Sequence, residues 1–158
     1  MVRESQRNEP YEEPPHDQIA GISRMHVQAM EAGIDEAWAG AGMHQLLLRT
    51  IGRKSGNEHK VALPYWVDDT GAKIVVASYA GNATHPHWYL NLADRDANPE
   101  VLVRTRDGSH WAEPEVLDGD EYSRTWDALT TDREFYREYQ TRTDRRIPLV
   151  RLVERRPA

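Results

Sequence analysis

The spacing of apolar residues changes several times along the chain, and each change predicts a different element. From Ile19 to about Ala32 apolar residues recur every three or four positions, which predicts an amphipathic helix. Asp17 precedes this helix at a position where its side chain could cap the first turn. The glycine-rich stretch 33–43 that follows predicts a connector with a helical turn at most.

Alternating apolar residues between short turns predict strands in the middle and at the end of the chain. The expected strands are His44–Ile51, His59–Val67, Ala72–Tyr79, Glu100–Arg106, Ser109–Leu117 and Ile147–Val153. Asp107 and Gly108, between the fourth and fifth strands, are a strong hairpin signal. Three further helices are expected, at Pro86–Ala93, at Gly119–Leu129 with Asp118 as its cap, and at Asp132–Thr141.

The order of these elements, α-β-β-β-α-β-β-α-α-β, favours an α+β fold. Hairpin-joined strands with helices between them predict about six mainly antiparallel strands that can curl into a barrel. The regular β-α-β alternation of a doubly wound nucleotide-binding sheet is missing. We expect residues 19–158 to form a single domain. Residues 1–18, which contain three prolines among charged residues, are expected to be a flexible tail.

Composition excludes several kinds of chemistry. The 158 residues are enough for an ordinary core, and the absence of cysteine rules out disulfides, thiolate catalysis and cysteine-ligated metal centres. A net charge of -6 argues against nucleic acid as a partner. No apolar run reaches the roughly 18 residues of a membrane span, and the polar N-terminus differs from a secretory signal. We therefore expect a cytoplasmic protein.

One short basic segment stands out against this acidic background. Arg53, Lys54 and Ser55 lie between Gly52 and Gly56, in the turn that joins the first two expected strands. A guanidinium fork and an ammonium both suit phosphate, and glycine lets backbone amides approach a ligand. The spacing matches neither a Walker A loop nor G-x-G-x-x-G. Composition alone leaves two alternatives, a phosphate-binding loop and an ordinary exposed turn.

The seven histidines raise the alternative of a metal site. His85 and His87 are separated by one residue, and His44 and His59 lie on adjacent expected strands. A zinc site needs three or four convergent ligands, and the sequence contains no H-E-x-x-H. We expect no metal site and regard these histidines as surface or pocket-lining residues. His87 is the one best placed to contact a substrate or a ring.

Four segments, TIGRKSG, VVASYAGNATHPHWYLNL, ANPEVLV and REYQTRTDRRIPLVRL, follow one another in a familiar order and spacing. Together they resemble the deazaflavin-dependent nitroreductase family, small actinobacterial oxidoreductases that use coenzyme F420. The resemblance runs from about Leu46 to Leu152. It implies an FMN-binding split-barrel-like fold. It also implies hydride transfer from the reduced coenzyme to a small organic acceptor, namely a quinone, an enone or a nitroaromatic.

The resemblance also implies roles for individual residues. It assigns the coenzyme's phosphate to the basic turn and the deazaflavin ring to the second strand, the end of the third strand and the helix that follows. The implied cofactor-binding residues are Arg53, Lys54, Ser55, Gly56, Lys60, Pro64, Tyr65, Trp66, Ala77, Ser78, Trp88 and Asn91. The implied hydrogen-bond or proton donors to the acceptor are Tyr136, Tyr139 and Ser78.

The sequence departs from the family pattern at a few positions. Tyr79 stands where the family often has lysine, which bears on binding of the coenzyme's acidic oligoglutamate tail. Arg133 and Phe135 precede Tyr136 where relatives often have another tyrosine, which bears on the acceptor. The arginines of the RTDRRIP segment are expected on a solvated face; they are Arg142, Arg145 and Arg146.

Two other functions remain as alternatives. FMN could replace F420, because both carry a phosphate, or the protein could carry or sense a ligand without turnover. The first helix follows an acidic tail, so we expect it to pack on the barrel or over the pocket mouth rather than contact an anionic membrane. The oligomeric state is left open.

Overall fold

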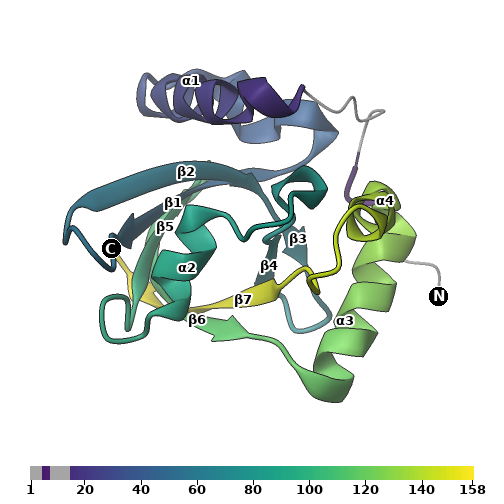
Figure 1. Cartoon of the computed structure of the whole chain (residues 1–158). Helices are drawn as coiled ribbons and strands as arrows, with labels where there is room; N and C mark the ends of the chain where they lie inside the picture. The colour runs from purple at the N-terminus through teal and green to yellow at the C-terminus, as the bar shows by residue number, and fades with distance from the viewer. Residues whose placement is uncertain (1–4, 8–14) are drawn as a thin grey trace.

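The computed structural model describes residues 5–7 and 15–158 and shows a curled antiparallel sheet flanked by helices (Figure 1). The sheet has seven strands in the order β2-β1-β5-β6-β7-β4-β3. The strands are β1 Gln45–Ile51, β2 Glu58–Pro64, β3 Trp66–Val67, β4 Lys73–Val76, β5 Val101–Thr105, β6 Gly108–Val116 and β7 Leu149–Pro157. The α+β class and the split-barrel-like architecture are confirmed.

The helices lie around this sheet. They are α1 Ile19–Glu31, α2 His87–Ala93, α3 Gly119–Asp132 and α4 Phe135–Thr141, with 3-10 segments at His16–Gln18, Asp35–Gly42 and Tyr79–Gly81. Figure 1 shows α1 lying across β2, while α3 and α4 lie together near β3 and β4. None of the helices in residues 15–158 is long and apolar enough to cross a membrane.

The expected strand His59–Val67 is divided in two, which accounts for the seventh strand. β2 pairs with β1 along its length, whereas β3 pairs with β4. Tyr65 lies between them, and its N–H donates to the carbonyl of His44 (2.9 Å). The two ends of the sheet are therefore consecutive in the chain, so the sheet must curl until its edges meet at Tyr65.

Of the two expected helix caps, one is wrong and the other is confirmed in position only. Asp17 lies in a 3-10 turn, and Gln18 occupies the N-cap position of α1. Asp118 does occupy the N-cap of α3, but its side chain makes no capping hydrogen bond. Both carboxylates are at positions where they can still favour the positive end of the helix dipole.

Gln6 lies within the segment that the sequence predicts to be a tail, and it is held by hydrogen bonds. Its side chain accepts from Val67 N (2.8 Å) and donates to Val67 O (2.9 Å). Its backbone N–H donates to Asp132 Oδ2 (3.0 Å), and its carbonyl accepts from Arg133 (3.0 Å). These bonds attach residue 6 to β3 and to the corner between α3 and α4. The rest of that segment falls mostly outside the described residues.

Candidate active site

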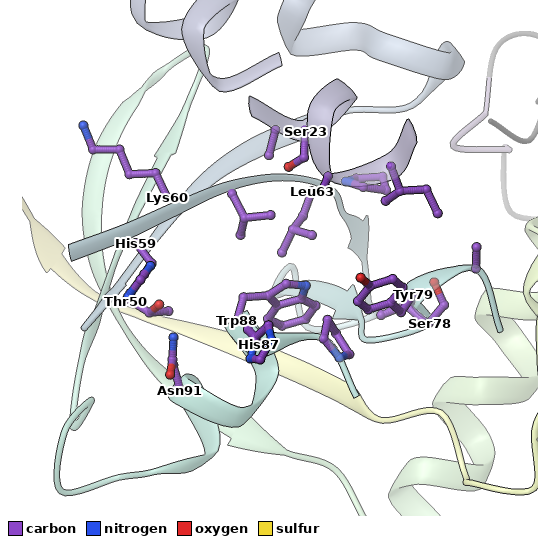
Figure 2. Close-up of a pocket in the computed structure, with 18 of the residues that line it drawn as sticks. Ser23, Thr50, His59, Lys60, Leu63, Ser78, Tyr79, His87, Trp88 and Asn91 are labelled. Carbon is purple, nitrogen blue, oxygen red and sulfur yellow. The ribbon is translucent and has the colours of Figure 1, made fainter. Parts of the chain in front are cut away.

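A cavity of about 620 Å³ lies between β2, the end of β1, α2, α4 and the first turns of α1 (Figure 2). Much of its wall is apolar, and charged side chains gather at one end. No aspartate or glutamate occurs among the described residues that line it. Such a cavity suits a ligand that is apolar over most of its length and anionic at one end.

The basic end is formed by the turn between β1 and β2. Gly52 accepts a hydrogen bond from Gly56 N (2.9 Å) and donates one to Asn57 O (2.8 Å). A Cβ on Gly52 would come within 2.5 Å of Ser55 Oγ and 2.8 Å of His59 Nε2, so a larger residue cannot fit without a shift. Gly56 has φ 74°, a conformation that favours glycine. The glycines thus allow the basic turn to fold tightly over the cavity.

Arg53 is oriented by a neighbouring amide. Asn91 Oδ1 accepts from Arg53 N (3.2 Å) and from Arg53 Nη1 (2.8 Å). Asn98, almost completely buried, in turn donates to the carbonyls of Asn91 and Ile51 (both 2.8 Å) and accepts from Ile51 N (2.8 Å). The end of β1, helix α2 and the guanidinium are therefore joined through two asparagines. No role was predicted for Asn98 from the sequence, although this residue lies in the ANPEVLV segment.

The two lysines at this end differ in their surroundings. Lys54 is exposed and has no ion-pair partner among residues 5–7 and 15–158. Lys60 Nζ lies 2.7 Å from Glu31 Oε2 of α1, and Figure 2 shows its side chain extending away from Asn91 and Thr50. Arg53 and Lys54 therefore present their charges to the cavity more directly than Lys60 does.

Two further polar residues lie in this region: Thr50, which was not anticipated from the sequence, and His59, which was expected to be a surface or pocket-lining residue. Thr50 is 1% exposed, and its hydroxyl has no hydrogen-bond partner among the described residues. Thr50 pairs with His59 across β1 and β2, and both side chains lie near Asn91 at the same end of the cavity (Figure 2). A buried hydroxyl without a partner is costly. The Thr50 hydroxyl, which has almost no accessible surface, is therefore a local cost of the fold near the basic turn.

The middle of the cavity is an apolar section. Figure 2 shows Leu63 of β2 and Trp88 of α2 on opposite sides of it. Pro64 also lines this section, and the Trp88 indole is partly buried and edge-on to Tyr89, with 6.3 Å between ring centroids. Opposed aliphatic and aromatic faces suit a flat ring system.

The other end is formed by α4 and by the turn after β4. Phe135, Tyr136 and Tyr139 line the cavity. The centroid of the Phe135 ring is 4.3 Å from that of Tyr136 and 5.8 Å from that of Tyr139. Ser78 and Tyr79 complete this end. The three predicted donors to an acceptor are therefore brought together, away from the basic end.

Arg133, one of the departures from the family pattern, stabilises the tyrosine end of the cavity through buried hydrogen bonds. It is completely buried and donates to the carbonyls of Tyr65 (2.9 Å) and Gln6 (3.0 Å). Burial lowers the pKa of its guanidinium, and the neighbouring Tyr136 and Asp132 oppose that shift. Arg133 thus joins the closing residue of the sheet to the helix that carries the tyrosines.

Ten of the predicted site residues line the cavity and four do not. Those in the wall are Arg53, Lys54, Ser55, Lys60, Pro64, Ser78, Trp88, Asn91, Tyr136 and Tyr139. Of the others, Gly56 lies in the basic turn, and Ala77 is buried with its N–H bonded to Pro148 O (3.0 Å).

Tyr65 and Trp66 belong to the closure of the sheet rather than to the cavity wall. The Tyr65 ring stacks on His44, with 5.9 Å between ring centroids. Trp66 is buried in the core, and its Nε1 donates to Asp132 (3.0 Å). No group of three potential metal ligands occurs in the part of the chain that the structure describes.

The chain is similar to known F420-dependent enzymes. The sequence model of the family described as F420H(2)-dependent quinone reductase matches residues 22–154. An F420H(2)-dependent quinone reductase of Mycobacterium tuberculosis (strain ATCC 25618 / H37Rv) is 34% identical over 113 residues, which cover 70% of this chain and 73% of that protein.

Two solved structures agree with this match. A structure described as an F420-H2 dependent reductase has a TM-score of 0.58 and 36% identity, and the match covers 68% of this chain and 92% of the other. A second, described as a domain-swapped dimer, has a TM-score of 0.60 and 30% identity, and the match covers 88% of this chain and 99% of the other.

The cavity fits the coenzyme that this family name implies. Cations at one end suit an anionic chain, and the apolar section suits a flat ring. A phosphate alone does not separate F420 from FMN, but the family match favours F420. The expected resemblance to F420-dependent oxidoreductases is confirmed, with quinones rather than nitroaromatics in the family's description. The chain belongs to the F420H2-dependent quinone reductase family, and it is an oxidoreductase whose coenzyme is F420.

Proposed function

We propose that this protein transfers a hydride from reduced F420 to a quinone within the cavity described above. One observation carries the proposal: a single cavity joins a basic turn, through an apolar section, to a cluster of hydroxyl-bearing side chains. The absence of carboxylates among its described lining residues favours an anionic ligand. Enones and nitroaromatics remain alternative acceptors within the same proposal.

The basic turn binds the coenzyme's phosphate in this proposal. Arg53 offers the planar fork that matches phosphate oxygens, with Asn91 fixing its orientation (2.8 Å). Lys54 adds a point charge, and Ser55 adds a hydroxyl donor.

The apolar section holds the ring and excludes water. When bound, the reduced coenzyme supplies the hydride that the reaction needs. Leu63, Pro64 and Trp88 would hold the ring in this section, next to the end of the cavity that contains the tyrosines. Holding two reactants in such a near-attack arrangement is a large source of rate enhancement.

The tyrosine end receives the acceptor. A quinone that gains a hydride, and with it an electron pair, acquires negative charge on its oxygen and needs one proton to become a hydroquinone. Tyr136 and Tyr139 present phenol groups there, and Ser78 presents a hydroxyl. A hydrogen bond or a proton from one of them stabilises that charge as it forms.

A fluorescence titration with F420, with FMN in parallel, tests the coenzyme part of the proposal. We expect saturable binding of F420 and weaker or no binding of FMN. Preference for FMN would keep the fold and overturn the proposed chemistry. Binding of neither coenzyme would mean that Arg53 and Lys54 belong to an ordinary basic turn without a role in coenzyme binding.

Turnover tests the rest of the proposal. Purified protein with F420H2 and a water-soluble quinone should oxidise the coenzyme and form hydroquinone in equal amounts. Saturable F420 binding without turnover of a quinone, an enone or a nitroaromatic would instead support a carrier or sensor.

A further inference from the structure

The turn at the tyrosine end of the cavity has an unusual backbone. Tyr79, Ala80 and Gly81 follow one another with φ values of 47°, 52° and 79°. Residues with a Cβ rarely adopt this left-handed conformation, because the Cβ crowds the following carbonyl. Ser78, Tyr79 and Ala80 all line the cavity. A strained turn at a ligand site persists only when its surroundings hold it in place.

Arg145 holds the turn in place on one side. Its guanidinium donates to the carbonyls of Ser78 (2.7 Å), Asn82 (2.9 Å) and Ala77 (3.1 Å). Ala77 and Ser78 come just before the left-handed segment 79–81, and Asn82 comes just after it. The rigid fork of arginine can satisfy three carbonyls at once, whereas an ammonium cannot match this geometry.

The expectation that Arg145 lies on a solvated face is therefore wrong. The side chain is partly buried, and desolvation lowers the pKa of its guanidinium. Arg142 and Arg146 are exposed but also make contacts: Arg142 lies over the Tyr139 ring (5.2 Å), and Arg146 lies over the Tyr122 ring (4.0 Å).

The opposite side of the turn lies against α4. A Cβ on Gly81 would come within 2.6 Å of the Tyr139 carbonyl and 2.9 Å of Arg142 Cβ. Arg142 Nη1 also donates to the Ala80 carbonyl (3.4 Å). Any displacement of the turn therefore alters the packing against the helix that carries Tyr136 and Tyr139.

We propose that Arg145 is a positioning residue, which holds the turn 78–82 in its left-handed conformation and thereby sets the geometry of the acceptor end of the cavity. The inference rests on the proposed function, because the importance of this end depends on an acceptor binding there. Arg145 does not touch the basic turn, so its removal should affect the acceptor and leave the coenzyme's phosphate contacts in place.

A second, smaller cavity makes a direct test possible. It has a volume of about 560 Å³ and is lined by Arg145, by His85 and His87, and by Tyr79 of the turn. His85 Nδ1 lies 3.2 Å from Arg145 Nη1. Because arginine has no acceptor, His85 must accept there through an unprotonated Nδ1. A guanidinium ion entering this cavity could therefore occupy the place of a truncated Arg145 side chain.

The test compares Arg145→Ala with the wild-type protein, in the presence and absence of guanidinium ions at low millimolar concentration. We expect kcat/KM for the quinone to fall on the order of 10²-fold, as for a small misplacement of a reacting group. The Kd for F420 should not change. Guanidinium should restore part of the activity of Arg145→Ala, whereas sodium at the same ionic strength should not. Arg146→Ala is the matched control and should show neither the loss nor the rescue.

Hydrogen exchange of the amides in residues 78–82 gives a readout that does not depend on activity. Arg145→Ala should speed this exchange, and guanidinium should slow it again. Should Arg145→Ala fail to fold, Arg145→Lys carries the test, with faster exchange in the turn and reduced quinone kcat/KM at unchanged F420 affinity.

Unchanged exchange and unchanged kcat/KM in either variant would overturn the inference. So would a parallel loss of melting temperature, F420 binding and activity without rescue, since that pattern indicates general destabilisation. Failure of the proposed function is distinguishable, because the wild-type protein itself would then not reduce quinones.

Discussion

The cationic side chains at the basic end of the cavity differ in their hydrogen-bond and ion-pair partners. Arg53 is fixed by Asn91, and Lys60 is paired with Glu31, whereas Lys54 is exposed. A side chain whose charge is already paired gains less from a new anion than one whose charge is not. Lys54 is therefore the most informative single cation to remove.

Lys54→Ala should weaken F420 binding by about 1–3 kcal/mol, the range for one charge-assisted contact to a phosphate. Fluorescence titration measures the change. Arg124→Ala, which removes one positive charge from an exposed position on α3, is the matched control and should leave the affinity as it is. An equal effect of both substitutions would mean that only net charge matters.

Tyr136→Phe tests the opposite end of the cavity. The substitution removes one hydroxyl and keeps the ring that packs against Phe135. We expect a lower kcat with the quinone and an unchanged Kd for F420, a loss on the order of 10²-fold if the phenol donates the proton. Steady-state kinetics and a coenzyme titration separate the two quantities. A loss confined to F420 binding would contradict the assignment to the acceptor side.

At the scale of secondary-structure elements, Asn98 connects the end of β1 to helix α2. Its three hydrogen bonds satisfy both backbone groups of Ile51 and the carbonyl of Asn91. Because Asn91 orients Arg53, the contact between a strand and a helix determines the position of a guanidinium. The turn 78–82 and α4 form a similar pair at the other end of the cavity.

Asn98→Ala should lower the free energy of unfolding by about 1–3 kcal/mol for each buried backbone group that it leaves without a partner. It should also raise the Kd for F420, since Asn91 and Arg53 lose their support. Denaturant unfolding and fluorescence titration provide the two measurements. Asn98→Asp keeps the acceptor for Ile51 N but loses the two donated hydrogen bonds, so its effect on stability should be intermediate. An Asn98→Ala variant with wild-type stability and wild-type F420 affinity would refute the coupling.

Much of this arrangement could be predicted from the sequence, because its signals are local. The period of α1, the Asp107–Gly108 hairpin and the glycine-framed basic turn are all patterns within a few residues. The break at Tyr65 was missed because residues 61–67 form one uninterrupted apolar run, which favours a single strand. What interrupts them is the change of partner from β1 to β4. That change is a property of the closed sheet.

The turn after β4 and the role of Arg145 were missed for a related reason. Val75, Val76 and Tyr79 favour a strand by composition, so the expected strand ran on to Tyr79 instead of ending at Val76. The three carbonyls that bind Arg145 lie more than 60 residues earlier in the chain. No local pattern reveals whether an arginine will meet water or backbone.

At the scale of the whole molecule, we expect stability to depend on pH through a buried histidine on β6. His110 is 6% exposed, and its Nε2 has no hydrogen-bond partner among the described residues. Desolvation lowers its pKa below the ordinary value of 6.5; Glu154 opposes the shift, and Lys73 adds to it. The pKa of His85 is lowered in the same direction, by burial and by Arg145.

Because the folded pKa lies below the unfolded one, the stabilisation from neutral His110 is complete above the unfolded pKa of 6.5. It is lost progressively as the pH falls below that value, since the unfolded state then binds the proton more readily. The melting temperature should therefore decrease on acidification below pH 6.5. His110→Gln, which cannot take up the proton, should show a smaller decrease, to which His85 still contributes. An identical pH profile for both proteins would remove His110 from the explanation.

A cytoplasmic location and the division into a tail of residues 1–18 and a domain of residues 19–158 remain predictions. The packing of α1 across β2 agrees with the expectation that this helix covers the barrel. The first turns of α1 also line the cavity through Ile19, Ala20 and Ser23. The helix therefore contributes to the site as well as to the exterior of the sheet.

The two ends of the cavity come from stretches that are far apart in the sequence. The basic turn lies between β1 and β2, whereas Tyr136, Tyr139 and Arg145 come from the last third of the chain. Substitutions in α4 and in the segment after it can change which acceptor is used while the basic turn retains the same coenzyme. A lineage of such proteins could acquire new acceptors in this way without having to evolve coenzyme binding again.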